Sequence, residues 1–398
     1  RADIPVILQK VREIITQIEP NDSIERFSGL GVRVYTGFAS FIDHQTISIN
    51  DEQIQAKYFI IATGARAAVA AITGIDTVKY YTNETIFSLN ETPKHLLVLG
   101  SGPIGCEIAD AFAMLGVKVS LIARSKLLAR DDEDLVSILC DSLKEHGVNI
   151  YKNAKTLAVT TNENREITLE VEQNGVKSFI TGSHLMLATG REANTRELNL
   201  EKAGVDYSKR GVIVDLQLRT SNKKIYALGD VIGGYEFTHI AGYHAGIIIR
   251  NILFRQRAKV NYKAVPWVTY TYPELAHVGL NLNDAKVSFS DKIKVTEFNY
   301  EENDRSRTNR EVIGKIKLIT DYRGRVLGVS ILGANAGELL YPWIDLINRG
   351  ETVKAITTNI IPYPTLYEIN KQVVGKYYAP ILFSKKVRLI VKMLKIFW

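Results

Sequence analysis

The chain has 398 residues, of which 46% are hydrophobic and 23% charged, and its net charge at pH 7 is +7. This length predicts two or three domains with separate cores. The composition is typical of a soluble globular protein, the mild charge does not indicate a nucleic-acid partner, and no apolar run of about 18 residues indicates a membrane-spanning helix.

The number and spacing of the cysteines bear on metal binding and on the redox environment of the protein. The two cysteines, Cys106 and Cys140, provide neither a disulfide framework nor a CxxC or Cys/His metal cluster. We therefore predict no metal site, and with no signal peptide recognisable we expect a reducing, cytoplasmic environment.

The first part of the chain is expected to contain helices followed by short strands. Apolar residues three and four apart predict a helix over residues 4–18, closed by Pro20, and a short polar helix is expected over 21–28. Strands are predicted at 32–35, 39–42, 46–49 and 58–61. The last of them enters Ala62-Thr63-Gly64.

The stretch His95 to Lys126 organises the rest of the chain. It is predicted to form a buried strand at 96–99, a glycine turn, a helix over 106–115 and a second strand over 117–122. A GxGxxG sequence lies where the first strand meets the helix, which is the context of a dinucleotide-binding fingerprint.

Each fingerprint glycine has an expected role. Gly100 permits a tight turn, Gly102 lets the backbone approach a pyrophosphate, and Gly105 lets the helix pack closely on the strand. The helix N-terminus would offer unpaired N–H groups to the phosphates. The alternative is a glycine-rich turn in an ordinary α/β sheet.

The end of the second strand indicates which dinucleotide binds. NAD sites usually place an acidic residue there for the ribose 2′-OH, whereas NADP sites place cations. This chain has Ala123, followed by Arg124, Lys126 and Arg130. The pattern favours NADP, with NAD as the alternative if Arg124 and Lys126 only form a solvated loop.

The next segment contains a second strand-to-glycine signature. A helix is predicted over 132–146, with Cys140 packed inside it, and two strands at 167–171 and 177–180 are joined by the hairpin turn Asn174-Gly175. A strand at 185–187 then enters Ala188-Thr189-Gly190-Arg191. Two such signatures suggest two related dinucleotide-binding lobes.

A further buried strand, 224–228, ends in Gly229-Asp230. Asp230 is expected either to accept a hydrogen bond from a sugar or polyol hydroxyl or to cap a helix. An apolar helix is predicted over 239–254. The remaining elements, strands followed by one helix, predict an α+β domain: 267–270, 277–279, 293–298, 314–319, 326–331 and the helix 336–349.

The C-terminal residues 384–398 form a basic amphipathic pattern. One helical face carries Lys385, Arg388, Lys392 and Lys395, and the opposite face carries Val387, Val391, Leu394 and Trp398. Such helices often lie on anionic membrane surfaces, so the tail is expected either to contact a membrane peripherally, at its inner face, or to dock on a partner or on the protein itself.

Taken together, GSGPIGCE, ATGR, IYALGD, VTYTYPELAHVG and PYPTLYE resemble the FAD-dependent pyridine nucleotide–disulfide oxidoreductases over about residues 32–374. The resemblance implies an α/β protein with two Rossmann-like domains, the FAD domain incomplete and discontinuous, and a C-terminal α+β dimerisation domain that makes a homodimer. The implied parts are 1–84 (partial FAD domain), 85–212 (NAD(P) domain), 213–260 (second FAD segment), 261–376 (dimerisation domain) and 377–398 (tail).

The resemblance also implies site residues. Backbone contacts to FAD are implied at Gly37, Ala39, Thr63 and Gly64, and Asp230 matches the residue that holds the flavin's ribityl chain. The nicotinamide dinucleotide would lie against Gly100, Gly102, Gly105, Glu107 and Gly190.

Two departures from the family bear on function. Tyr363 stands where several members have a catalytic His paired with the acid that matches Glu368, and mercuric reductases also have Tyr there. A phenol is a poor base near neutral pH. In addition, the N-terminal FAD fingerprint and the CxxxxC redox pair are absent from this sequence, so the chain is expected to be an incomplete member.

The resulting expectation is an enzyme that passes a hydride from NADPH to FAD and on to a thiol-reactive small molecule or metal ion, with Hg(II) as the favoured substrate. The alternatives are a dihydrolipoamide dehydrogenase-like disulfide oxidoreductase and a non-catalytic dinucleotide-binding remnant.

Overall fold

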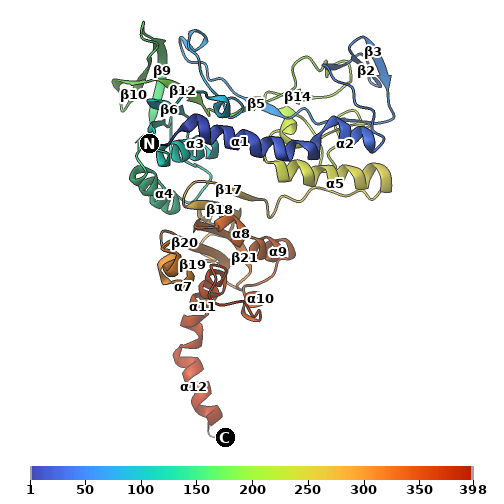
Figure 1. The fold of residues 1–398 in the computed structure, drawn as a ribbon. Coiled ribbons are helices and arrows are strands. Elements are labelled where there is room, and N and C mark those ends of the chain that lie inside the picture. The colour runs from blue at the N-terminus through green and yellow to red at the C-terminus, as the bar shows by residue number, and fades with distance from the viewer. Residues whose placement is uncertain (1, 396–398) are drawn as a thin grey trace.

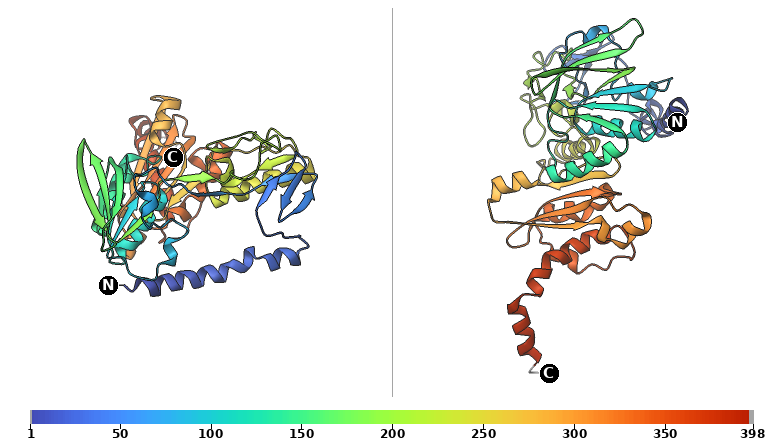
Figure 2. Two further views of the ribbon diagram at one scale, coloured as in Figure 1. Left: turned by 90° about the horizontal axis from the view of Figure 1, so that it is seen from above. Right: turned by 90° about the vertical axis from the view of Figure 1, so that its left-hand side faces the viewer.

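The computed structural model describes residues 2–395 and has three lobes and a projecting tail (Figure 1). Two α/β lobes lie side by side, and a third lobe of antiparallel strands and helices lies below them in this view. The helix α1 (Ile4–Ile18) runs along both upper lobes (Figure 2). This architecture confirms the predicted fold class.

The first lobe is built on a parallel sheet in the order β12-β6-β7-β8. Its strands and flanking helices are β6 (His95–Leu99), α3 (Pro103–Met114), β7 (Lys118–Ile122), α4 (Glu133–Glu145), β8 (Val148–Tyr151) and β12 (His184–Leu187). Leu96 and Val98 pack in the core shared with α3 and α4, whereas Leu97 and Leu99 pack in a separate core on the other face. Burial on both faces explains the continuous apolar run of β6.

A β-meander covers that other face of the sheet. It contains β9 (Ala154–Thr161), β10 (Ile167–Gln173) and β11 (Val176–Gly182). Asn174 and Gly175 both have positive φ, at 53° and 77°, and Gln173 pairs with Val176. The predicted Asn-Gly hairpin is therefore confirmed, because two consecutive left-handed residues match the twist of the strands that they join.

The second lobe contains small sheets around a two-stranded parallel core, β4 (Phe59–Ile61) with β16 (Ile225–Ala227). Its other elements are α2 (Ile24–Gly29), β1 (Ala39–Phe41), β2 (Thr46–Ile49), β3 (Glu52–Gln55), β5 (Ala65–Ala67), β13 (Arg191–Ala193), β14 (Tyr207–Ser208), β15 (Gly211–Val212), η4 (Gly229–Ile232) and α5 (Thr238–Phe254). The antiparallel pair β5 and β13 joins residues on either side of the first lobe in the sequence.

The third lobe is a five-stranded antiparallel sheet in the order β17-β18-β21-β20-β19. Its elements are β17 (Pro266–Thr269), β18 (Glu274–Gly279), α6 (Leu282–Phe289), β19 (Ile293–Asn299), α7 (Asp304–Asn309), β20 (Lys315–Asp321), β21 (Val326–Gly333), α8 (Ala336–Leu339), α9 (Tyr341–Arg349), α10 (Lys354–Thr357) and α11 (Glu368–Leu382). Trp343 is fully buried in this lobe, and its indole N–H donates to Asn370 Oδ1 at 2.7 Å.

Three sequence-based expectations are corrected. Residues 32–35 are not a strand, since nothing in the described part of the chain pairs with them and Val32 stays half exposed. The helix expected over 336–349 is two helices separated at Leu340, and the second begins at Tyr341 with Pro342 in its first turn. The short helix expected over 21–28 begins at Ile24, because Ser23 caps it.

The tail begins with a helix, α12 (Lys385–Leu394), as the sequence predicts, while Trp398 lies outside the described residues. Within residues 2–395, no helix is long and apolar enough to cross a bilayer.

Candidate functional site

The glycine turn between β6 and α3 has the geometry that its sequence requires. Gly100 has φ +138°, and a Cβ built on it would lie 2.0 Å from the carbonyl oxygen of Ala188. A Cβ on Gly105 would lie 2.7 Å from the carbonyl oxygen of Gly100. A Cβ on Gly102, in contrast, would meet no atom within 4 Å. Gly100 and Gly105 are therefore needed for the fold of the turn, whereas Gly102 leaves open space beside the backbone.

That open space lies at the N-terminus of α3. Gly102 is the N-cap residue, with φ −82° and ψ −179°, and no side chain caps the helix. Pro103 follows in the first turn, where its missing N–H is not needed. The first-turn N–H groups and the helix dipole therefore face a position with room for an anion, which fits the pyrophosphate of a dinucleotide.

The residues beyond β7 lie where the ribose of such a nucleotide is expected. Ala123 is fully buried and bonds through its backbone to Tyr151 and Ala154, so it offers no carboxylate. Arg124 is exposed. The ammonium group of Lys126 pairs with Glu133 at 3.0 Å on the surface, so Lys126 already has an acidic partner.

Glu107 and Asp110 connect α3 to the third lobe. Glu107 Oε1 accepts from the N–H of Tyr270 at 2.9 Å, and burial raises the pKa of this carboxyl. Asp110 Oδ2 accepts from the N–H of Tyr272 at 2.7 Å, and its other oxygen lies 2.7 Å from His146 Nδ1. The loop after β17 is thus fixed to the helix that begins at the fingerprint.

The two Ala-Thr-Gly segments lie beside each other because β5 pairs with β13. Thr63 Oγ1 donates to the carbonyl oxygen of Asn194 at 2.8 Å, and the Asn194 amide donates back to the Thr63 carbonyl at 2.9 Å. Thr189 Oγ1 donates to the carbonyl of Ala68 at 2.7 Å. Gly64 and Gly190 both have positive φ, at 66° and 134°. Both turns therefore need glycine, and the structure brings them together.

Asp230 lies next to this pair of turns. Its Oδ2 accepts from Arg191 Nη2 at 2.9 Å, and the same nitrogen donates to the Ala65 carbonyl at 2.8 Å. Asp230 belongs to η4, which has no side-chain cap, so the helix-cap alternative is wrong. Arg191 Nε is buried and has no hydrogen-bond partner among the described residues. The Glu236 carboxylate lies 3.7 Å from it as an ion-pair partner, beyond hydrogen-bond distance, so a polar ligand atom such as one from the polar chain of a flavin cofactor could still bond to it.

The remaining residues implied to contact FAD lie in another part of the second lobe. Gly37 has φ +149° and packs against the Asn50 side chain, which donates to the Thr36 carbonyl. Ala39 begins β1. Among the described residues, no hydrogen bond links Gly37 or Ala39 to Thr63, Gly64 or Asp230.

Tyr363 and Glu368 lie in the third lobe and do not hydrogen-bond to each other in the described structure. The Tyr363 hydroxyl donates to Asp304 Oδ2 at 2.9 Å, and this bond raises the pKa of the phenol. Glu368 accepts from the Thr365 N–H at 3.4 Å at the start of α11. Near neutral pH, Tyr363 is therefore present as phenolate even less often than an ordinary tyrosine, which argues against a role as general base.

Both cysteines pack in the core of the first lobe. Burial raises the pKa of the Cys106 thiol far above its ordinary value, which suppresses the reactive thiolate. These two cysteines are therefore structural.

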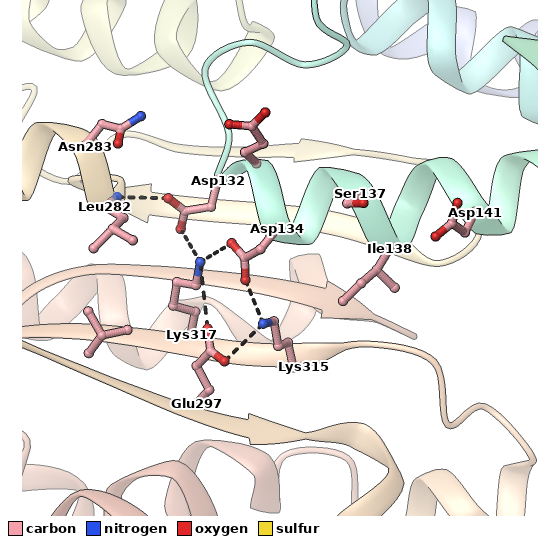
Figure 3. A pocket seen from close by; sticks show the side chains of 12 residues that line it. Asp132, Asp134, Ser137, Ile138, Asp141, Leu282, Asn283, Glu297, Lys315 and Lys317 are labelled. Carbon is pink, nitrogen blue, oxygen red and sulfur yellow. Dashed lines mark hydrogen bonds and ion pairs between the residues drawn. The ribbon is translucent and has the colours of Figure 1, made fainter.

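One charged cluster was missed by the sequence reasoning. A groove of about 810 Å³ between α4 and the third lobe is lined by Asp132, Asp134, Glu297, Lys315 and Lys317 (Figure 3). Lys317 is only 2% exposed and contacts all three carboxylates, at 3.5 Å for Asp132 and 3.8 Å for Glu297. Lys315 bonds Asp134 at 2.6 Å and Glu297 at 3.0 Å.

This cluster connects two lobes rather than forming a metal site. Asp132 also accepts from the Leu282 N–H and from Ser330 Oγ in the third lobe. Within residues 2–395, no three His, Cys, Asp or Glu side chains are placed so that they could hold a metal ion. The only signal in the sequence was the alternation of Lys315 and Lys317 with apolar residues along one strand.

Asp131, at the same lobe boundary, gives a pH-dependent prediction. It accepts from the Trp267 indole N–H at 2.9 Å, but burial raises its pKa to about 6. The folded protein therefore binds a proton that the unfolded chain releases near pH 4, so this group's contribution to stability falls between about pH 4 and 6. Asp131→Asn keeps the acceptor and should raise the unfolding free energy by about 1–3 kcal/mol at pH 7.

Urea unfolding at several pH values checks this expectation. The difference between Asp131→Asn and wild type should vanish at pH 4. A variant that is equally stabilised at pH 4 and pH 7 would contradict the assignment of the titration to Asp131.

Comparison with known proteins agrees with this arrangement. A family model described as pyridine nucleotide-disulphide oxidoreductase matches residues 3–245, and the dimerisation domain of the same family matches residues 265–374. Mercuric reductase from Staphylococcus aureus is 34% identical over 97% of this chain and 70% of its own length. The mercuric reductase of Bacillus cereus is 33% identical, and the chain spans 60% of its length.

Other similar proteins are named for different activities. A dihydrolipoyl dehydrogenase from Bacillus subtilis is 31% identical over 85% of this chain and 74% of its own length. The solved structure of the HOCl-induced flavoprotein disulfide reductase RclA from Escherichia coli has a TM-score of 0.85 and 28% identity, and the match covers 92% of this chain and 85% of that chain.

Proposed function

Because the chain belongs to the pyridine nucleotide–disulphide oxidoreductase family, we propose that it carries electrons from NADPH through FAD to a thiol-reactive acceptor, with Hg(II) as the substrate. The overall reaction would be NADPH + Hg²⁺ → NADP⁺ + H⁺ + Hg⁰, with the electron pair passing from FAD through a redox dithiol that Cys106 and Cys140 do not supply, because both are buried. The family is FAD-dependent and takes its electrons from NAD(P)H, whereas the choice of NADPH and of Hg(II) belongs to this proposal. The observation that carries it is the uncapped N-terminus of α3 at the glycine fingerprint, followed by Ala123 and Arg124.

The chain's own residues would bind and orient the two cofactors. The first-turn N–H groups of α3 would hold the pyrophosphate of NADPH beside Gly102, and Arg124 would pair with the 2′-phosphate. Asp230 and Arg191 would hold the polar chain of FAD near Gly64. When bound, FAD supplies the chemistry that accepts a hydride from nicotinamide and passes the electron pair on.

Support for Hg(II) comes from two sources. Two relatives at about one third identity are named mercuric reductases, and Tyr363 stands where a catalytic His would favour dihydrolipoamide chemistry. A homodimer is consistent with the matched dimerisation domain. The rival is dihydrolipoamide oxidation, which the dihydrolipoyl dehydrogenase relatives favour.

Three assays distinguish these activities, and the two turnover assays are run with a small-molecule dithiol added, because both cysteines of this sequence are buried. NADPH-dependent formation of Hg⁰ supports the proposal, and faster turnover of dihydrolipoamide with NAD⁺ supports the rival. A protein that stays colourless when FAD is added, yet binds NADPH, indicates a non-catalytic dinucleotide-binding remnant. A yellow protein that is bleached by NADPH excludes the remnant.

Nucleotide preference has its own test. Arg124→Glu removes the proposed 2′-phosphate ligand and adds a negative charge, so the Kd for NADPH should rise about 10- to 100-fold while that for NADH stays within about threefold. Lys202→Glu makes the same charge change at an exposed site of the second lobe and should alter neither Kd. Equal weakening of NADPH and NADH by Arg124→Glu would overturn the NADP assignment.

A further inference from the structure

The helix α12 stands away from the rest of the protein. It follows α11 after a short break, and the Ser384 hydroxyl caps it by accepting from the Val387 N–H. Figures 1 and 2 show it projecting away from the third lobe. None of its ten residues, Lys385–Leu394, is buried. It therefore forms a helix without a tertiary contact that would bury its apolar side chains.

Those apolar side chains are extensive and lie together. Val387, Ile390, Val391 and Leu394 share one helical face because they are three and four positions apart. Ile390, Val391 and Leu394 are 46–57% exposed, and the end of α11 adds exposed Ile381, Leu382 and Phe383. A surface of this kind normally marks a site of interaction with a protein or a membrane.

The opposite face of α12 is cationic. Lys385, Arg388 and Lys392 lie there, and Lys395 extends the same face by one turn, whereas Lys386 lies on the apolar side, four positions before Ile390. The sequence has no acidic residue after Glu368. These five cations equal most of the chain's net charge of +7, so the remainder of the protein is close to neutral.

We propose that α12 binds the surface of an anionic lipid bilayer, with its axis in the plane of the interface. Its apolar face would enter the acyl boundary while the Lys and Arg side chains reach the lipid phosphates. A second copy of the tail is a poor occupant, because two such helices would bring cations together with no acid to pair them. Ten residues with four cations are also too short and too charged to span the bilayer.

The test is co-sedimentation of the full chain with vesicles. Binding to phosphatidylcholine vesicles that contain phosphatidylglycerol should be strong at low salt and weaken as salt is raised, and binding to pure phosphatidylcholine should be weak. The triple variant Lys385→Glu, Arg388→Glu, Lys392→Glu should lower the partition coefficient at least about 100-fold. Ile390→Ser with Leu394→Ser should also abolish binding, because the apolar face is lost.

A matched control has the same charge change elsewhere. Lys202→Glu, Lys209→Glu, Lys259→Glu alters three exposed lysines of the other lobes and should bind the anionic vesicles like wild type, apart from a small long-range effect. Unchanged melting temperatures would show that all variants are folded. Equal binding by the tail and control triples, or tail-dependent self-association without vesicles, would overturn the proposal.

Discussion

Replacing Gly102 with Asp should abolish dinucleotide binding while leaving the protein at least as stable as wild type. The backbone of Gly102 already has the extended conformation of an N-cap residue, and a Cβ there meets no neighbour. An Asp side chain can therefore accept from the first-turn N–H groups of α3, which stabilises helices by about 0.5–2 kcal/mol. The same carboxylate would occupy and repel the position that we assign to the pyrophosphate.

We expect the Kd for NADPH to rise at least about 100-fold, since two or three charge-assisted hydrogen bonds are lost. Fluorescence titration with NADPH measures the loss, and urea unfolding measures the stability. Gly102→Asn is the matched variant, because it caps the helix without a charge and should weaken binding less. Undiminished NADPH binding by Gly102→Asp would place the nucleotide elsewhere.

The second large effect is expected at the boundary between the first and third lobes. Lys317→Met leaves Asp132 buried without its cation and should lower the unfolding free energy by about 3–5 kcal/mol. Lys126→Met breaks the exposed pair with Glu133 and should change stability by at most about 0.5 kcal/mol. Urea unfolding of both variants provides the comparison.

A double variant separates charge from packing at this boundary. Lys317→Met combined with Asp132→Asn removes the uncompensated carboxylate, and Asn can still accept from the Leu282 N–H. It should recover part of the stability that Lys317→Met loses. If Lys317→Met proves as mild as Lys126→Met, the cluster does not hold the lobes together.

The sequence was most informative where one short segment determines its own structure. The strand, glycine turn and helix around Gly100 could be predicted because their determinants are local in the sequence. The glycines of the turn, the spacing of the apolar residues and the close packing of helix on strand all involve residues within about twenty positions of one another. The Asn174-Gly175 hairpin and α12 were predictable for the same reason. The helix α3 begins three residues earlier than expected, because Pro103 is favoured in a first turn.

Contacts between distant segments were not predictable. Lys317 forms ion pairs with Asp132 and Asp134, which lie more than 180 positions away in the sequence, and no local sequence pattern predicts such a pair. The strands β8 and β9 were missed because their burial is set by neighbouring elements rather than by a clear alternation. The strand expected at 32–35 had a strand-like composition but has no partner strand in the described residues.

In the candidate site, too, local motifs could be predicted from the sequence, whereas contacts between distant residues could not. The sequence identified both Ala-Thr-Gly turns and Asp230, but only the structure shows that Arg191 bonds to Asp230 and that its buried Nε has an ion-pair partner, Glu236 at 3.7 Å, and no hydrogen-bond partner among the described residues. Tyr363 was identified from its place in a motif, whereas its hydrogen bond to Asp304 required the fold.

The most direct test of the nucleotide assignment is a crystal structure of this protein with NADP⁺ bound. We expect the pyrophosphate within hydrogen-bonding distance of the first-turn N–H groups of α3, beside Gly102, and the 2′-phosphate at Arg124. NADP⁺ bound in the groove between α4 and the third lobe, or at α3 with its 2′-phosphate turned away from Arg124, would contradict this account.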